Sequence, residues 1–313
     1  MSESHRDRFP HRVATLLAAF RRQRPLRGGS LIVTVFGDAL APRGGAIALG
    51  SLIELMAPFG LTERLVRTSV ARLVHEDWLA SRRIGRRSEY RLSARGRERF
   101  AEATARIYSG PPGAWHGRWT LVVMPGGTAA ERDAVRRQLG WRGFGQIAPG
   151  VFAHPTANAA AVRAFLASAR LERAALLFET TGAALADADR DRVVRQGWDL
   201  RELAMRYRHF IGRYRTVGAA LAARAPLAGD AAFVVRTLLI HEYRRIHLRD
   251  PLLPRGLLPA DWPGLAAYET CRQLYAEVVA PTEAYLDAHA TRLAGPLPRA
   301  DRSMAHRFPP IEG

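Results

Sequence analysis

The sequence contains no lysine, so its 47 strongly basic residues are all arginines. They outnumber the 29 acidic residues and give a formal net charge of +18. A GC-rich genome would favour arginine codons and so explain the missing lysine, but it does not explain the excess of positive charge. A large positive charge favours polyanionic partners, first nucleic acid and then anionic cofactors or membrane surfaces.

Cysteine is almost as scarce, because Cys271 is the only one in 313 residues. A single thiol excludes an intramolecular disulfide framework and a cysteine-rich zinc site. Long apolar runs are also missing: stretches such as Leu31–Phe36 are far shorter than the ~20 residues of a membrane-spanning helix. The polar N-terminus has no apolar core of a secretory signal. We therefore expect a soluble, cytoplasmic protein with no membrane partner.

The excess of positive charge is concentrated in the first third of the chain. Residues 1–100 hold 19 arginines and nine acidic residues, which is more than half of the net charge. Within this part, Leu61–Phe100 has 11 arginines against five acidic residues. A polyanion-binding face is therefore expected in this region.

Three helices followed by a two-stranded hairpin are predicted in the same region. The helices are expected at Ser30–Leu40, which is predicted to be amphipathic, at Gly50–Pro58 and from Thr62 to about Glu76. The strands are expected at Trp78–Ile84 and Glu89–Leu92, joined by the basic turn Gly85–Ser88. Thr62 is a good N-cap for the third helix. This order is typical of a winged helix-turn-helix, in which the third helix reads DNA and the hairpin is the wing.

The third helix combines an apolar stripe with a polar face suited to DNA. The candidates on this face are Arg64, Arg67, Thr68 and Arg72. Their spacing of i, i+3, i+4 and i+8 places them on one side of a helix. Arginine can bind O6 and N7 of guanine with two hydrogen bonds. A basic helix face that is merely solvated is the alternative interpretation.

The predicted wing carries a second group of arginines. They are Arg82, Arg83, Arg86, Arg87 and Arg91, of which Arg83, Arg86 and Arg87 are the candidates for DNA contact. Such residues suit phosphate or minor-groove contact. Because helix and wing agree, DNA binding is favoured over a solvated basic face, although each single arginine remains open.

Pro111–Gly113 marks a boundary, after which the pattern changes. Buried strands such as Trp119–Met124 and Ala174–Glu179 alternate with helices in a β-α-β-β-α-β order, which is ferredoxin-like. The remainder is predicted to be helical. We expect a basic, loosely structured arm at 1–25 with one helical stretch at Val13–Phe20, a DNA-binding domain at 26–110, a connector or dimerisation domain at 111–195, a helical regulatory domain at 196–295 and a flexible tail at 296–313.

Several segments together resemble the PaaX family of phenylacetate-catabolism repressors. They include SLIVTVFGDALAPRGG (Ser30–Gly45), GSLIELMAPFGLTERLVRTSVARLVHEDWL (Gly50–Leu79), GRRSEYRLSARGRERF (Gly85–Phe100), GFGQIAPGVFAHP (Gly143–Pro155) and FVVRTLLIHEYRRIHLRDPLLPRGLLPADWPG (Phe233–Gly264). The resemblance covers about residues 26–290. It implies an α+β, multidomain protein with a winged helix-turn-helix, a ferredoxin-like middle domain similar to small CRISPR-associated endoribonucleases, and a helical C-terminal domain.

The resemblance also implies a function. Members of this family are dimeric transcriptional repressors that phenylacetyl-coenzyme A releases from DNA. We therefore expect a homodimer bound to a double-stranded DNA operator of an aromatic-acid catabolic operon, with a CoA thioester as effector. By position, the resemblance assigns Glu63–Leu73 to DNA reading and Gly85–Ser88 to the wing.

A site for a CoA thioester should combine arginines, an aromatic surface and an apolar pocket. Seven candidates for effector contact lie in the C-terminal part, namely Arg236, His241, Tyr243, Arg244, Arg245, His247 and Trp262. Five positions in this part share one face of a helix by their spacing, namely Arg236, Ile240, Tyr243, Arg244 and His247. A dimer interface or an ordinary network of ion pairs between helices is the alternative.

No enzymatic chemistry is expected. A metal-dependent nuclease would place a carboxylate at the end of the first strand of the middle domain, where Val123, Met124 and Pro125 stand instead. We expect no catalytic residue, no metal and no cofactor. Two alternatives stay open: a regulator of the same build that answers to a different acyl-CoA or aromatic ligand, and a non-specific nucleic-acid-binding or nuclease-like protein.

Overall fold

The computed structural model describes residues 8–23, 28–126, 128–171, 173–181, 186–222 and 227–311. It forms two compact units: one combines the chain up to Gly110 with His209–Arg245 and the part from Ala266 onward, and the other combines Pro111–Arg208 with Ile246–Leu265. The expected α+β, multidomain organisation is confirmed. The C-terminal helical region is divided between the two units, although we expected it as a domain of its own.

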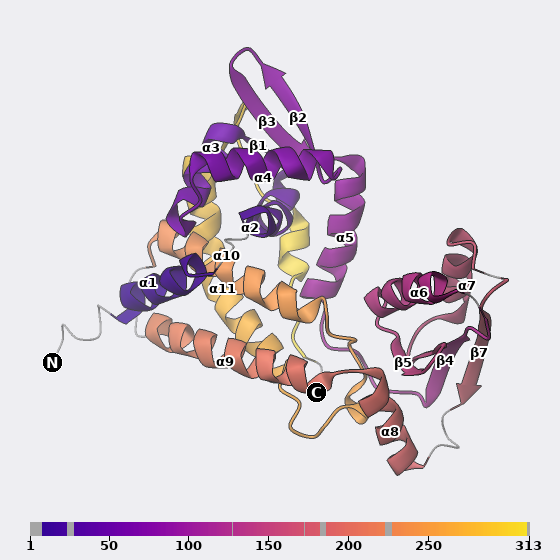
Figure 1. Cartoon of the computed structure of the whole chain (residues 1–313). Helices are drawn as coiled ribbons and strands as arrows, with labels where there is room; N and C mark the ends of the chain where they lie inside the picture. Colours follow the sequence, from indigo (N-terminus) through magenta and orange to yellow (C-terminus); the bar gives the residue numbers. More distant parts are fainter. Residues whose placement is uncertain are drawn as a thin grey trace. The chain divides into compact units, whose positions relative to one another are not determined.

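The N-terminal third supplies most of the first unit (Figure 1). Its elements are α1 (Arg8–Arg21), α2 (Gly28–Val35), the π-helical η1 (Phe36–Leu40), the 3-10 helix η2 (Ala41–Arg43), β1 (Ala46–Ala48), α3 (Leu49–Met56), η3 (Ala57–Phe59), α4 (Glu63–His75), β2 (Leu79–Ile84), β3 (Arg87–Leu92) and α5 (Ala94–Tyr108). The strands form an antiparallel sheet in the order β1-β3-β2. Figure 1 shows the β2–β3 hairpin projecting beyond α4.

Two features of this region differ from the expectations. The helix predicted at Ser30–Leu40 is buried on nearly all sides and passes into the π-helical η1, so it is not amphipathic. Residues 8–21 of the expected arm form α1, which is longer than the helical stretch expected at Val13–Phe20 and is packed, because Phe9, Val13, Leu16 and Phe20 bury one face of the helix. The remaining residues of that arm, 1–7 and 24–25, lie outside the described part.

The second unit is built on a four-stranded antiparallel sheet in the order β5-β6-β4-β7. Its elements are β4 (Arg118–Val123), α6 (Ala129–Trp141), β5 (Gly145–Ala148), β6 (Val151–His154), α7 (Ala159–Ser168), β7 (Leu176–Thr181) and α8 (Asp187–Gly197). A core that includes Val122, Leu139 and Leu166 lies between the sheet and helices α6 and α7. A second cluster packs Trp119 against Trp198 with ring centroids 6.3 Å apart.

The C-terminal elements follow as α9 (Leu200–Ala222), α10 (Gly229–His247), η5 (Arg255–Leu257), α11 (Gly264–His289), β8 (Thr291–Arg292), β9 (Gly295–Pro296) and η6 (Arg302–His306). Among the helices that the structure describes, none combines the length and apolarity needed to span a bilayer. Residues 232–240 of α10 are buried on every side. A helix of this kind is covered by neighbouring elements all round.

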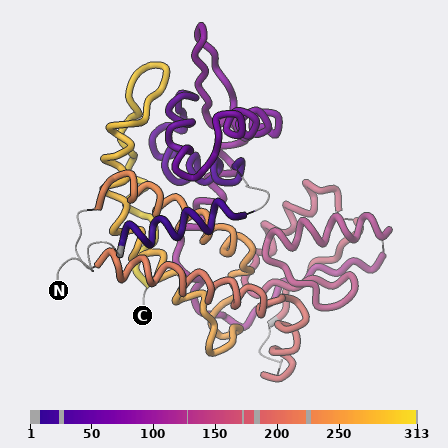
Figure 2. Tube along the Cα trace, turned by 60° about the vertical axis from the view of Figure 1, so that its left-hand side comes forward, coloured from indigo at the N-terminus to yellow at the C-terminus, as the bar shows by residue number. Residues whose placement is uncertain are grey.

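The short β8–β9 hairpin returns the chain to the N-terminal elements (Figure 2). The hydroxyl groups of Ser51 and Thr291 are 2.8 Å apart. The backbone N–H of Leu293 donates to the carboxylate of Glu89, on β3, at 2.9 Å. The C-terminal part of the chain therefore supports a strand of the projecting hairpin.

The expectation of a flexible tail is wrong for the described residues up to Ile311, because Phe308 anchors this segment to the first unit. Phe308 is 4% exposed, and its ring lies 5.0 Å from that of Tyr108 and 5.2 Å from that of Tyr275. Its backbone N–H donates to the carbonyl of Tyr108 at 2.9 Å. The tail is polar and contains prolines, so its composition did not indicate that one aromatic residue, Phe308, is buried.

A buried carboxylate, Asp38 in η1, connects the two ends of this unit. It is 3% exposed and accepts hydrogen bonds from Arg236 at 2.7 Å, Arg307 at 2.9 Å, Tyr108 at 2.6 Å and Tyr275 at 3.1 Å. Burial by itself raises the pKa of Asp38, but the attraction of the two guanidinium groups outweighs burial and lowers the pKa below its ordinary value.

A second buried pair extends this network. Arg43, in η2, is 2% exposed and donates to Glu283 at 2.5 Å and to Asp287 at 2.6 Å. Glu283, on α11, also accepts from Arg236 at 2.5 Å. The segment before the β1–β3–β2 sheet is thus held by α10, α11 and the C-terminal tail together.

Replacing Phe308 by alanine should lower the free energy of unfolding by about 3–5 kcal/mol, because the change leaves a cavity among aromatic rings. Urea unfolding followed by circular dichroism measures this loss. The exposed Arg302, six residues earlier, is the control, and Arg302→Ala should change stability by less than about 0.5 kcal/mol. Equal stability of Phe308→Ala and the wild type would contradict the packed tail.

Asp38→Asn should lower the free energy of unfolding by about 3–5 kcal/mol at pH 7, because two buried arginines lose a counter-charge. The folded-state pKa of Asp38 lies below its unfolded value of about 3.9, so the carboxylate stabilises the fold above that pH and loses this effect as the pH falls further. The difference between the two proteins should therefore shrink below about pH 4.

Urea unfolding at several pH values between pH 7 and pH 2 checks this expectation. A difference that stays constant over the whole range would show that charge is not the cause. If Asp38→Asn does not fold, Tyr275→Phe removes only one hydrogen bond to the carboxylate and should cost about 1–2 kcal/mol.

Candidate nucleic-acid interface

Helix α4 is oriented by its cap and its buried side. The side chain of Thr62 accepts a hydrogen bond from the N–H of Leu65 at 3.3 Å, and the acidic Glu63 stands in the first turn, where the helix dipole favours it. Val66, Ser69, Val70 and Leu73 bury one side of the helix. The opposite side is left to the solvent.

This exposed side carries the four residues that the sequence predicted for DNA contact, Arg64, Arg67, Thr68 and Arg72. Arg67 pairs with Glu63 at 2.7 Å, but both side chains are more than half exposed. An exposed ion pair of this kind contributes only about 0–1 kcal/mol, so Glu63 holds the Arg67 side chain only weakly. Arg64 has no ion pair within the described ranges, and it is free to meet a phosphate or a base.

Helix α2 packs closely on α4, and two glycines allow it. A Cβ atom on Gly28 would lie 3.2 Å from the side chains of Leu61 and Ser69. On Gly29 it would lie 2.7 Å from the guanidinium of Arg72. The start of α2 therefore packs closely against α4, and the missing side chains of the two glycines leave room for Ser69 and Arg72.

The hairpin presents its arginines around a two-residue turn. Ile84 and Arg87 are paired across the strands, and Gly85 between them has a φ of +58°, a conformation that glycine adopts without strain. Arg83 donates to the carbonyl of Gly85 at 2.9 Å. Arg86 and Arg87 are exposed and form no ion pair with any described residue. The tip of the hairpin is thus basic and open to a ligand.

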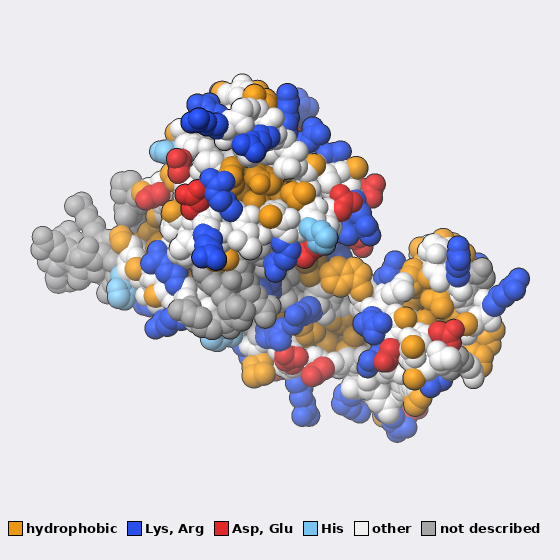
Figure 3. Space-filling view, turned by 45° about the horizontal axis from the view of Figure 1, so that its top comes forward, with side chains coloured by type: hydrophobic (Ala, Val, Ile, Leu, Met, Phe, Trp, Pro, Cys, Tyr) orange, Lys and Arg blue, Asp and Glu red, His pale blue; other side chains and the backbone are white. Residues whose placement is uncertain are grey.

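The base of the hairpin is fixed to α5. Trp78 packs edge-on against Phe100 at 5.5 Å, and the guanidinium of Arg99 lies 4.7 Å above the indole ring. Gly96 permits the close approach, because a Cβ atom there would lie 2.1 Å from the carbonyl oxygen of Trp78. In Figure 3, basic side chains are spread over the upper part of this unit, where Figure 1 shows the hairpin and α4.

The structure places the predicted effector contacts differently. Arg236 is 1% exposed, and its guanidinium binds Asp38 and Glu283. Arg244 donates to Thr34 and to the carbonyl of Ser30, at 2.8 and 2.7 Å, and burial lowers the pKa of Arg244 to about 10. Both arginines bind groups of the N-terminal elements, and Arg236 also binds Glu283 on α11.

The other candidates are also packed within the fold. His241 is fully buried, with Nδ1 2.9 Å from the hydroxyl of Thr34, and Tyr243 is fully buried beside Phe308. Arg245 is partly buried on the same helix. The seven predicted effector residues are divided between the two units. Those from Arg236 to Arg245 belong to the first unit.

His247 and Trp262 belong to the second unit, where both contact Tyr207. Nδ1 of His247 is 3.2 Å from the hydroxyl of Tyr207, and the Trp262 ring meets the Tyr207 ring at 83°. The helical spacing on which the prediction rested is real, but the side chains have internal partners. Contact with an effector remains a prediction for all seven residues.

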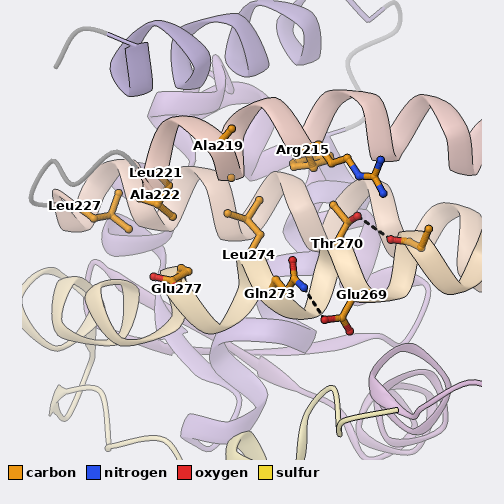
Figure 4. A pocket seen from close by; sticks show the side chains of 13 residues that line it. Arg215, Ala219, Leu221, Ala222, Leu227, Glu269, Thr270, Gln273, Leu274 and Glu277 are labelled. Carbon is orange, nitrogen blue, oxygen red and sulfur yellow. Dashed lines mark hydrogen bonds between the residues drawn. The ribbon is translucent and has the colours of Figure 1, made fainter. Parts of the chain in front are cut away.

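A cavity of about 1130 Å³ lies between α9 and α11 (Figure 4). Its apolar lining includes Ala219, Leu221 and Leu274, and its polar lining includes Glu269 and Glu277. None of the seven predicted effector residues lines it. The two carboxylates are poorly suited to the phosphates of a CoA molecule.

Sequence reasoning offered ion pairs between helices only as the alternative for the cluster that contains Arg236, and it identified none of the partners in the buried network. Asp38 interrupts an otherwise apolar run, which is a signal for a buried partner, because an unpaired carboxylate is costly to bury. Its partners Arg236 and Arg307 lie 198 and 269 residues away, and no local pattern points to them. Arg43 and Glu283, separated by 240 residues, gave no signal at all.

Comparison with known proteins connects these features to a family. Three family models match successive segments: PaaX-like protein at residues 27–96, the PaaX protein central Cas2-like domain at 112–193 and the PaaX-like protein C-terminal domain at 198–288. The transcriptional repressor PaaX of Escherichia coli (strain K12) is 38% identical over 286 residues, which cover 91% of this chain and 90% of that protein.

Among solved structures, the uncharacterized protein Rv0674 from Mycobacterium tuberculosis is similar with a TM-score of 0.49 and 24% identity, over 75% of this chain and 89% of that chain. The E. coli relative is named a repressor and not an enzyme. Its match extends over α4, the hairpin and the C-terminal helices alike. The chain belongs to the PaaX family of transcriptional repressors.

Proposed function

We propose that α2, α3, α4 and the β2–β3 hairpin act as a winged helix-turn-helix that binds a double-stranded DNA operator. The observation that carries this proposal is the coincidence of exposed arginines on one side of α4 with exposed arginines at the hairpin tip. In proteins of this build the recognition helix enters the major groove, and a basic extension contacts the backbone or minor groove. The repressor role of the family agrees with this arrangement.

The second unit is proposed to be a ferredoxin-like domain that joins or pairs two subunits. Its strands and helices follow the β-α-β-β-α-β order with the sheet order β5-β6-β4-β7, which supports this classification. A homodimer would place two α4 helices on two half-sites of a near-palindromic operator. In this proposal the unit has a connecting role and no catalytic one.

The regulated genes are proposed to be an aromatic-acid catabolic operon of the phenylacetate type. An arylacetyl-CoA such as phenylacetyl-CoA would release the repressor, as the resemblance to phenylacetate-catabolism repressors implies. Release requires that the effector bind more tightly to the form that does not bind DNA. A coupling of about 1–3 kcal/mol would weaken operator binding by about 5- to 150-fold.

A gel-shift assay tests this function directly. The full-length protein is mixed with DNA from the region upstream of its gene, with a shuffled duplex of equal length as control, and with a panel of CoA thioesters. Specific binding that phenylacetyl-CoA reverses supports the proposal. Reversal by another acyl-CoA alone would change the effector, and equal binding to the shuffled duplex would indicate a non-specific nucleic-acid-binding protein.

Arg67→Ala should weaken operator binding by about 5- to 150-fold and relax base preference at one position, because a contact with two hydrogen bonds to guanine is worth about 1–3 kcal/mol. Fluorescence anisotropy with operator variants measures both effects. Arg137→Ala is the matched control, because Arg137 is an equally exposed helical arginine in the second unit. Unchanged affinity of Arg67→Ala would contradict DNA reading by α4.

Arg87→Ala should weaken binding to all duplexes alike and reduce the salt dependence of binding by about one unit of slope, because one phosphate contact is lost. Titrations at several salt concentrations measure the slope. A loss confined to the operator, with the salt slope unchanged, would show that the hairpin reads bases and does not contact phosphates.

A further inference from the structure

Helix α1 has an exposed side that its packing does not use. His11, Thr15, Ala18 and Arg22 follow one another at helical spacing and are all exposed. The opposite side is buried, and Phe20 meets Phe59 edge-on at 6.2 Å. Helix α1 therefore lies on the body of the unit with a polar, basic side toward the solvent, and its sequence from Arg8 to Arg21 contains no acidic residue.

The C-terminal end of α1 is fastened to the segment that leads into α4. The guanidinium of Arg21 donates to the carbonyl of Pro58 at 2.5 Å. Gly60 has a φ of +80°, and a Cβ atom there would lie 3.2 Å from the side chain of Arg21. Arg64 follows Pro58 by six residues, which can span at most about 20 Å. The end of α1 is thus bound to η3, the element that precedes α4 in the chain.

Arg22 is the next residue along the chain, directly after the Arg21 that binds Pro58. Its backbone N–H still donates to the carbonyl of Ala18 at 3.1 Å, so its position is set by the last turn of α1. The side chain is exposed and has no ion pair within the described ranges. An arginine held on a helix end, with no carboxylate to satisfy it, is complementary to an anionic group that arrives from outside.

We propose that Arg22, at the end of α1, binds a backbone phosphate beside the major groove that α4 enters. This inference rests on the proposed reading of DNA by α4. The major groove is about 12 Å wide and is bordered by phosphates on both edges, so a group within reach of the first turn of α4 meets one of these edges. Contacts of this kind fix the register of a protein on DNA without reading sequence.

The test compares Arg22→Ala with Arg12→Ala in the full-length protein. Arg12 is exposed on the same helix but lies about 15 Å further from the end fastened to Pro58, since ten residues of helix separate the two. Affinity for the operator duplex defined by the gel-shift assay, and for the shuffled duplex, is measured by anisotropy between 50 and 300 mM salt (about a sixfold range). Arg22→Lys keeps the charge and serves as the conservative variant.

Arg22→Ala should reduce the salt slope by about 0.9 and lower affinity about eightfold at 0.1 M salt, equally on both duplexes. Arg12→Ala and Arg22→Lys should keep the wild-type slope. Equal losses in Arg22→Ala and Arg12→Ala would reveal a general effect of net charge and overturn the proposal.

The outcome can be separated from that of the proposed function. If Arg67→Ala weakens operator binding while Arg22→Ala keeps the wild-type slope and affinity, only the contact from α1 is overturned. If the wild type binds neither duplex, the proposed function fails and the contact from α1 fails with it. Arg12 and Arg22 are both exposed, so the midpoint of thermal unfolding of Arg12→Ala and Arg22→Ala should equal that of the wild type. This measurement confirms that the two variants are folded.

Discussion

The first unit depends on the burial of one carboxylate, that of Asp38. Removing a carboxylate from water costs several kcal/mol, and only close guanidinium partners with good geometry offset this cost. Arg236 comes from α10 and Arg307 from the C-terminal tail, while Tyr108 closes the site from α5. A DNA-binding domain made of the first hundred residues alone would therefore leave this charge buried without its partners.

The buried ion pairs also connect the C-terminal helices mechanically to the sheet of the projecting hairpin. Glu283 on α11 holds both Arg236 and Arg43, and α11 leads through His289 into the β8–β9 hairpin, which touches β3 through Leu293 and Glu89. A displacement of α11 must therefore either break buried ion pairs or carry the sheet of the projecting hairpin with it. Packed interfaces of this kind switch between discrete arrangements and do not deform continuously. The C-terminal helices are thus joined to the elements with the basic surface by the same bonds that stabilise them.

The features that sequence could predict are those with local causes. The cap of Thr62, the glycine of the Gly85–Arg86 turn and the apolar run Trp119–Met124 each depend on neighbours within a few residues, and the structure contains a helix, a turn and a strand at these places. The exposed side of α4 follows from the same periodicity. Both the general α+β organisation and the candidate DNA-facing residues could therefore be found without a structure.

The features that escaped prediction have distant causes. The helical stretch at Val13–Phe20 gave no sign of what its apolar side contacts, and the tail looked too polar to pack, yet Phe20 and Phe308 each contact aromatic rings far along the chain. The face of α10 looked suited to an anionic ligand, because periodicity shows which side chains are aligned and not what they meet. For Arg236 and Arg244 the partners are Asp38 and the α2 segment, which no local pattern could identify.

The bond between Asp38 and Arg307 also sets an order of events during synthesis. Arg307 is joined to the chain 269 residues after Asp38, which corresponds to roughly 15–55 s at ~5–20 residues per second. For most of this interval the arginines of α4 and the hairpin are already made, while the core beneath them lacks its last charged partner and its last aromatic ring. An unfinished or prematurely cut chain therefore carries the basic surface of α4 and the hairpin on an incomplete support.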